Sequence, residues 1–150
     1  MKSVIELEIL GPRPRVAELF ATPENSPRWM DDLGRYEAIS GTPGMPGSKY
    51  RLVPKKGSLA FEATVKAREL PRRVQVELDS PKVTVSVTGT FEELSPGRTR
   101  LVSEEVFTFR GLFSKAFGLL ARPAIRRAHR RHMEGFKRFA EREGRPGPAV

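Results

Sequence analysis

The C-terminal segment, residues 111–143, constrains the fold more than any other part of the sequence. From Pro123 onward, at 100° per residue, apolar positions fall on one side and arginines on the other. The apolar side carries Ala124, Ile125, Ala128, His129, His132, Met133, Phe136, Phe139 and Ala140. This pattern predicts a long helix that starts near Pro123 and buries one face against the rest of the chain.

A second apolar group precedes Pro123, on the side that the arginines occupy downstream. It comprises Leu112, Phe113, Ala116, Phe117, Leu119 and Leu120. One straight helix would leave this group outside, and proline removes a backbone donor and clashes with the preceding turn. We therefore expect a bend or a short separate helix at Pro123. The group is either an ordinary packing adjustment or a movable flap over a pocket mouth.

The preceding hundred residues alternate between apolar and polar positions, which is typical of half-buried strands. Turns rich in Gly and Pro separate them. Strands are predicted at residues 3–10, 34–40, 48–53, 58–70, 73–79, 83–94 and 98–109. Two short helices, the second carrying Trp29 and Met30, are predicted between the first two strands. The order favours an α+β fold in which the long helix crosses the inner face of an antiparallel sheet of about seven strands.

Length and composition indicate one domain, residues 1–143, followed by a flexible tail at residues 144–150. No run approaches the roughly 20 apolar residues that a membrane span needs. The N-terminus alternates charged and apolar residues, unlike a signal peptide. We expect a cytoplasmic protein. The absence of cysteine excludes disulfides and cysteine nucleophiles, and with two histidines the sequence indicates no metal or cofactor.

The net charge of +9 is concentrated on the C-terminal helix. Residues 111–143 hold nine Lys/Arg against three Glu, whereas residues 1–110 hold seventeen against fifteen acidic residues. Arg126, Arg127, Arg130 and Arg131 are the candidates for binding a polyanion. The simplest interpretation is a solvated helix face. The alternative is a weak contact with an anionic membrane surface, and no nucleic-acid motif accompanies the basic face.

Several stretches resemble bacterial polyketide cyclase/dehydrase-type proteins of the START/Bet v 1-like (SRPBCC) superfamily. They are VAELFATPENSPRWMDDLGRYEAISG, GMPGSKYRLV, GTFEELSPGRTRLVSEEVFTFRG and ARPAIRRAHRRHMEGFKRFAE. The resemblance spans residues 3–143 and implies a helix-grip fold with a cavity between the sheet and the helix. Members of that group carry lipids and isoprenoid quinones or cyclise polyketide chains, so the resemblance implies a cavity more firmly than a reaction. It also places Trp29 near the cavity mouth.

Candidate cavity residues follow from strand and helix phase, with Trp29 added by resemblance. They are Trp29, Tyr50, Leu52, Phe61, Ala63, Val76, Val87, Phe107, Phe117, Leu120, Ala128, His132 and Phe136. For each of these residues the alternative is plain core packing. We expect the cavity to reach solvent near Trp29 and Phe117, with His132 and Tyr50 as its main polar contacts.

Two polar residues in apolar phases are candidates for acid/base chemistry. His132 falls in the middle of the helix's apolar arc, with His129 nearer its edge, and Glu105 shares the phase of Phe107. A histidine facing a glutamate can transfer protons. The alternative is a structural hydrogen bond or a Glu105 that points to solvent.

Three functions remain open from the sequence. The first, which we favour, is a non-enzymatic binder or carrier of a hydrophobic molecule such as a lipid, a quinone or a polyketide-like aromatic. The second is a cyclase or dehydratase that uses His132 and Glu105. The third is an interaction module that docks its arginine face on anionic membrane, RNA or protein. The sequence does not indicate an oligomeric state.

Overall fold

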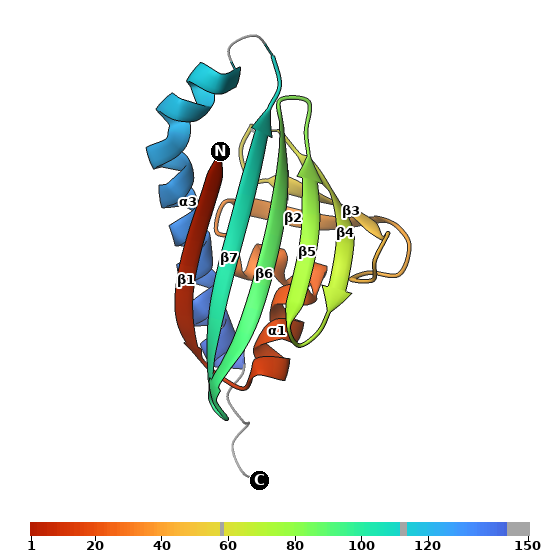
Figure 1. Ribbon diagram of the computed structural model, residues 1–150. Helices are drawn as coiled ribbons and strands as arrows, with labels where there is room; N and C mark the ends of the chain where they lie inside the picture. Colours follow the sequence, from red (N-terminus) through yellow and green to blue (C-terminus); the bar gives the residue numbers. More distant parts are fainter. Residues whose placement is uncertain (58, 112–113, 144–150) are drawn as a thin grey trace.

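A computed structural model describes residues 1–57, 59–111 and 114–143. The elements follow the predicted order and confirm the α+β helix-grip fold (Figure 1). They are β1 (Lys2–Leu10), α1 (Arg13–Ala21), the 3₁₀ turn η1 (Pro23–Asn25), α2 (Ser26–Trp29), β2 (Leu33–Ser40), β3 (Lys49–Pro54), β4 (Phe61–Glu69), β5 (Arg73–Asp79), β6 (Val83–Ser95), β7 (Arg98–Phe109) and α3 (Ser114–Glu143). The predicted tail, residues 144–150, lies outside the described residues, as do Leu112 and Phe113.

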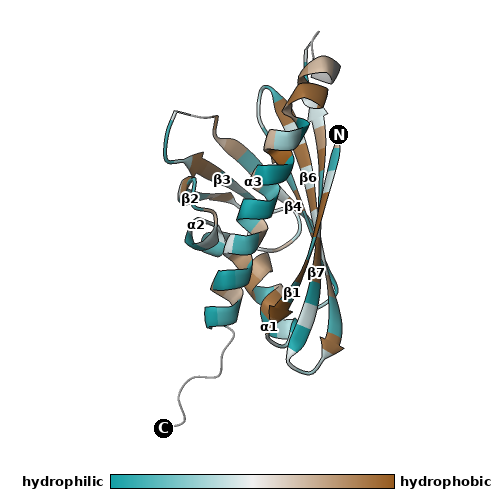
Figure 2. Cartoon of the chain, turned by 90° about the vertical axis from the view of Figure 1, so that its left-hand side faces the viewer, coloured by the Kyte–Doolittle hydropathy of each residue, from teal (hydrophilic) through white to brown (hydrophobic). Residues whose placement is uncertain are grey.

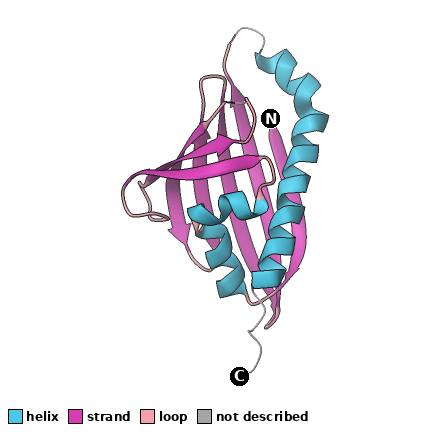
Figure 3. Cartoon of the chain, turned by 180° about the vertical axis from the view of Figure 1, so that it is seen from behind, coloured by secondary structure: helices cyan, strands magenta, loops and turns pink. Residues whose placement is uncertain are grey.

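The seven strands form one antiparallel sheet in the order β1-β7-β6-β5-β4-β3-β2. Neighbours are sequential except at one edge, where the first strand pairs with the last and places Ser3 opposite Glu105. Seen from behind, the three helices lie on one face of the sheet, and its β2–β3 end turns across that face (Figure 3). The sheet therefore curves around the space in which α3 lies.

The C-terminal half of α3 anchors the helix to this concave face. Met133, Phe136 and Phe139 are buried together with Ile5 and Ile9 of β1, inside a cluster that also includes apolar residues of α1. A separate cluster joins β2, β3 and β4. Two centres of packing therefore hold the two ends of the curved sheet.

A glycine lets α2 pack directly on α3. A Cβ atom at Gly135 would overlap the backbone carbonyl oxygen of Trp29, the last residue of α2. Only a residue without a side chain allows this approach. Gly135 therefore sets the distance of α2, and of the Trp29 side chain, from the long helix.

The prediction for the start of α3 was wrong. The helix begins at Ser114, about two and a half turns before Pro123, and runs through this proline as one element. The expected separate helix does not form, and Ala124, assigned to the buried face, is exposed. Phe117, Leu119 and Leu120 remain on the outside of the helix, 58%, 69% and 82% exposed.

We predict that Gly135→Ala lowers the free energy of unfolding by about 1 to 3 kcal/mol, as overpacking does. The overlap with the Trp29 carbonyl outweighs the gain of up to about 1 kcal/mol in helix propensity. Urea unfolding measures the change. Gly97→Ala is the control, because a Cβ there meets no atom within 4 Å. Equal stability of the two variants would show that α2 does not rest on α3 in this way.

Candidate functional site

Two adjoining chambers lie between the sheet and the helices. The inner chamber has a volume of about 80 Å³ and the outer chamber about 610 Å³. Five residues line both chambers: Met30, Leu52, Leu78, Glu105 and His132. The chambers therefore form one elongated cavity with a shared waist. The outer volume falls within the range of roughly 300 to 1,000 Å³ that is usual for small-molecule sites.

Most of the predicted cavity residues line these chambers. Those in the inner chamber are Trp29, Tyr50, Val76 and Val87, those in the outer chamber are Phe61, Phe107 and Ala128, and those in both are Leu52 and His132. Whether they bind a ligand stays a prediction.

Four predicted residues lie elsewhere. Ala63 and Phe136 are fully buried in the core and line neither chamber, whereas Phe117 and Leu120 are exposed on the outside of α3. The strand and helix periodicity of the sequence correctly placed Ala63 and Phe136 on inward faces, but it did not distinguish a core position from a cavity wall.

The cavity opens at a different place from the predicted one. The exposed residues of the outer chamber are Asp32, Lys55, Lys56 and Leu59, from the loops before β2 and after β3. Sequence reasoning did not select these residues because they lie in turns, where strand phase gives no direction.

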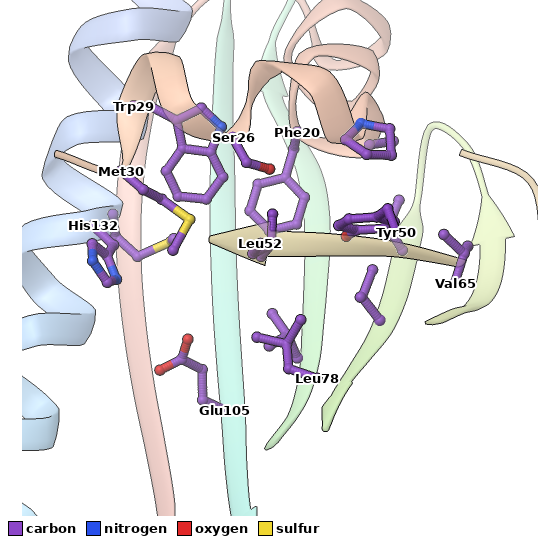
Figure 4. A pocket seen from close by; sticks show the side chains of 16 residues that line it. Phe20, Ser26, Trp29, Met30, Tyr50, Leu52, Val65, Leu78, Glu105 and His132 are labelled. Atoms are coloured by element: carbon purple, nitrogen blue, oxygen red, sulfur yellow. The ribbon is translucent and has the colours of Figure 1, made fainter. Parts of the chain in front are cut away.

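Trp29 lies at the inner end of the cavity and not at its mouth (Figure 4). Its ring stacks on Phe20 with centroids 5.9 Å apart and meets the edge of Phe136 at 5.4 Å. Such aromatic pairs add stability beyond their buried area. Trp29 is therefore part of a rigid wall that closes the inner chamber.

Two polar side chains point into this apolar space. Figure 4 shows Glu105 and Tyr50 on opposite sides of the inner chamber. Burial raises the pKa of the Glu105 carboxyl to about 7 and raises the pKa of the Tyr50 phenol well above its usual range. Both groups can therefore donate a hydrogen bond at neutral pH, and a polar group buried without a partner costs about 1 to 3 kcal/mol.

His129, expected near the edge of the apolar arc, is the more buried of the two histidines. Its Nδ1 lies 2.8 Å from the Ser3 hydroxyl and its Nε2 lies 2.9 Å from the Ser103 hydroxyl. The Glu105 carboxylate is 3.6 Å from Nδ1. Burial, followed by the charges of His132 and Arg130, lowers the pKa of His129 to about 4. A neutral ring held by two serines has a structural role.

His132 lies at the waist, with its Nε2 2.9 Å from the Asp32 carboxylate. The predicted pair of His132 and Glu105 thus shares one cavity, but each has a different neighbour: Asp32 for His132 and His129 for Glu105. Asp31, Asp32 and His132 also bring possible metal ligands within 4.8 Å of one another. Arg131 already pairs with both carboxylates, at 3.3 and 3.5 Å, so we assign no metal there.

The chain matches, over residues 6–141, a family model described as polyketide cyclase / dehydrase and lipid transport. The protein belongs to this family. The match covers β1 to α3 and so includes both chambers. No curated protein matches the chain significantly in sequence.

Solved structures similar to this member of the polyketide cyclase / dehydrase and lipid transport family share its fold at low sequence identity. The Zhui aromatase/cyclase from Streptomyces sp. R1128 is 17% identical with a TM-score of 0.81, over 100% of this chain and 99% of that one. A START superfamily protein from Mycobacterium smegmatis is 13% identical, TM-score 0.71, over 95% and 96%. The major latex-like protein 151 from Panax ginseng is 12% identical, TM-score 0.75, over 97% and 98%.

We predict that Glu105→Gln stabilises the protein increasingly as pH rises. The unfolded carboxyl ionises near pH 4.5 and the folded one near pH 7, so the wild type loses stability over this interval. Glutamine does not ionise. Its advantage, measured by urea unfolding, should grow from near zero at pH 4.5 to about 3 kcal/mol above pH 7.

The control is Glu104→Gln, because Glu104 precedes Glu105 on β7 and pairs with Lys2 in solvent. Its effect should not grow over this interval. A Glu105→Gln advantage that does not change with pH would contradict the raised pKa.

Proposed function

We propose that the protein binds a hydrophobic small molecule in the joined chambers. The observation that carries this proposal is an apolar cavity that continues from Trp29, past a waist at Leu52 and Leu78, to an opening at Lys55. Protein interiors are close-packed, and lost contacts around a void cost roughly 24 cal/mol per Å³. A ligand that fills this cavity supplies the missing contacts, so its binding is favourable.

The polar groups restrict the chemistry of the ligand. Oxygen atoms of a ligand in the inner chamber can accept a hydrogen bond from the Tyr50 phenol on one side and from the protonated Glu105 carboxyl on the other. A purely aliphatic molecule would leave both donors without partners. The ligand class that fits is an apolar molecule with a carbonyl or hydroxyl oxygen, which includes lipids, quinones and polyketide-like aromatics. The family description, which includes lipid transport, supports the same class.

Ala128→Trp should block the outer chamber, because Ala128 lines it and is partly buried. We expect at least about tenfold weaker uptake of the neutral probe Nile red, measured by fluorescence titration. Ala124→Trp is the matched control, since Ala124 lies one turn earlier on the same helix but is exposed and lines neither chamber. It should bind the probe like the wild type.

Leu78→Trp at the waist is a second blocking variant if Ala128→Trp does not fold. Circular dichroism and thermal unfolding verify the fold of every variant. The proposal loses its physical basis if the wild type does not take up the probe, or if both blocking variants take it up as well as the wild type does.

A second candidate function is dehydration or cyclisation of the bound molecule. It is favoured by the contact of His132 with Asp32, which orients the imidazole at the waist where Glu105 also lies. The Nδ1 atom of His132 would take a proton from the carbon next to a carbonyl. The protonated Glu105 would give its proton to the departing hydroxyl, so that water leaves and a carbon–carbon double bond forms.

This second function predicts a pH dependence that binding alone does not. Loss of 18 mass units from a β-hydroxy ketone ligand, followed by mass spectrometry, should slow above about pH 7, because Glu105 then loses its proton. Glu105→Gln and His132→Ala should each abolish the reaction. If the wild type leaves the ligand unchanged, the proposed dehydration or cyclisation is contradicted and binding alone remains the proposed function.

A further inference from the structure

The outer face of α3 changes from apolar to basic along its length. Leu119 and Leu120 lie two turns before Arg126 and Arg127 on the same sides of the helix, because seven residues complete almost two turns. Figure 2 shows the contrast as brown first turns above a teal middle. The helix continues through Pro123 and leaves Phe117, Leu119 and Leu120 exposed on its outside.

Three large apolar side chains are exposed in the part of α3 that precedes Pro123. Phe117, Leu119 and Leu120 are 58%, 69% and 82% exposed, and the Phe117 ring lies 5.5 Å from the ring of Phe109. Contiguous exposed apolar side chains mark interaction sites more often than single ones do.

The arginines that follow are available for an anionic partner. Arg126, Arg127 and Arg130 are exposed and make no ion pair with any other residue that the structure describes. Arg131, in contrast, is held by Asp31 and Asp32. The cationic part of this face thus consists of Arg126, Arg127 and Arg130.

We propose that this face docks on an anionic lipid bilayer. The docking face consists of Phe117, Leu119, Leu120, Arg126, Arg127 and Arg130. The apolar side chains enter the boundary between headgroups and acyl chains, and the arginines bind lipid phosphates, as amphipathic helices with a basic side do on membranes. No helix of the described residues is long and apolar enough to cross a membrane, so the contact is peripheral.

A bilayer fits this face better than RNA or a second copy. Phe117 is the one residue of this face with a ring on which a base could stack, whereas several aromatic side chains are the usual means of holding single-stranded RNA. A symmetric dimer through this face joins the same patch to itself and so offers the arginines no anionic surface. A bilayer alone offers apolar depth and negative charge side by side.

The docking face adjoins the cavity. A groove of about 380 Å³ beside Leu119 and Gly118 includes Phe107, which also lines the outer chamber. Docking would therefore bring the bilayer close to the space in which we propose that a hydrophobic molecule binds. The docking proposal does not depend on that binding, and its test needs no ligand.

Cosedimentation of the full chain with vesicles tests the proposal. We expect binding to phosphatidylcholine vesicles that contain phosphatidylglycerol, little binding to phosphatidylcholine alone, and weaker binding as salt is added. L119Q/L120Q and R126E/R127E/R130E should each weaken binding at least about tenfold, and glutamine preserves helix propensity.

The charge-matched control is R15E/K66E/R72E, which reverses three exposed charges on α1, β4 and the β4–β5 turn. It should bind vesicles like the wild type. Equal binding to neutral vesicles would overturn the proposal, as would no vesicle binding at all. A dimer that L119Q/L120Q dissolves in light scattering, without vesicle binding, would assign the face to a second copy. RNA binding that survives L119Q/L120Q, again without vesicle binding, would assign the arginines to RNA.

Discussion

The packing of Phe136 against Phe20 and Trp29 is the interaction on which the rest of the structure depends. The Phe136 ring lies 5.2 Å from Phe20 and 5.4 Å from Trp29, and it joins α1, α2 and α3 on the concave face of the sheet. This contact fixes only the C-terminal half of the helix. The middle of α3 crosses the sheet with small or modest side chains, Ala128 and Ile125, and therefore leaves the outer chamber beneath it.

The way in which α3 crosses the sheet also determines the surroundings of the polar side chains buried between them. Tyr50 and Glu105 line the inner chamber, and burial raises the pKa of both groups. His129 lies where helix and strands are close, and two serines satisfy its ring. Burial acts on both sites, but the ring nitrogens of His129 already have serine partners, whereas a ligand in the inner chamber can form hydrogen bonds with Tyr50 and Glu105.

Much of the fold could be predicted from the sequence because turns separate segments in which apolar and polar residues clearly alternate. The strands at residues 73–79 and 98–109 have the predicted bounds, since Gly or Pro turns precede them. The start of α3 was missed because the prediction assumed that large apolar residues of a helix are buried, whereas Phe117, Leu119 and Leu120 are exposed. The partners of His132 and Glu105 were missed because Asp32 lies 100 residues from His132, and periodicity does not report such contacts. The order of burial of the two histidines was wrong because Ser3 of β1 and Ser103 of β7 contact His129, and the periodicity of a helix does not report such contacts.

The central claim is that the space between α3 and the sheet holds a small molecule. Native mass spectrometry of the protein purified from its own host tests this most directly. The account predicts a complex of one chain with one small apolar molecule, which dissociates to the bare chain when the protein is denatured in organic solvent. Repeated preparations that contain only the bare chain, even at the lowest activation energy, would contradict the account.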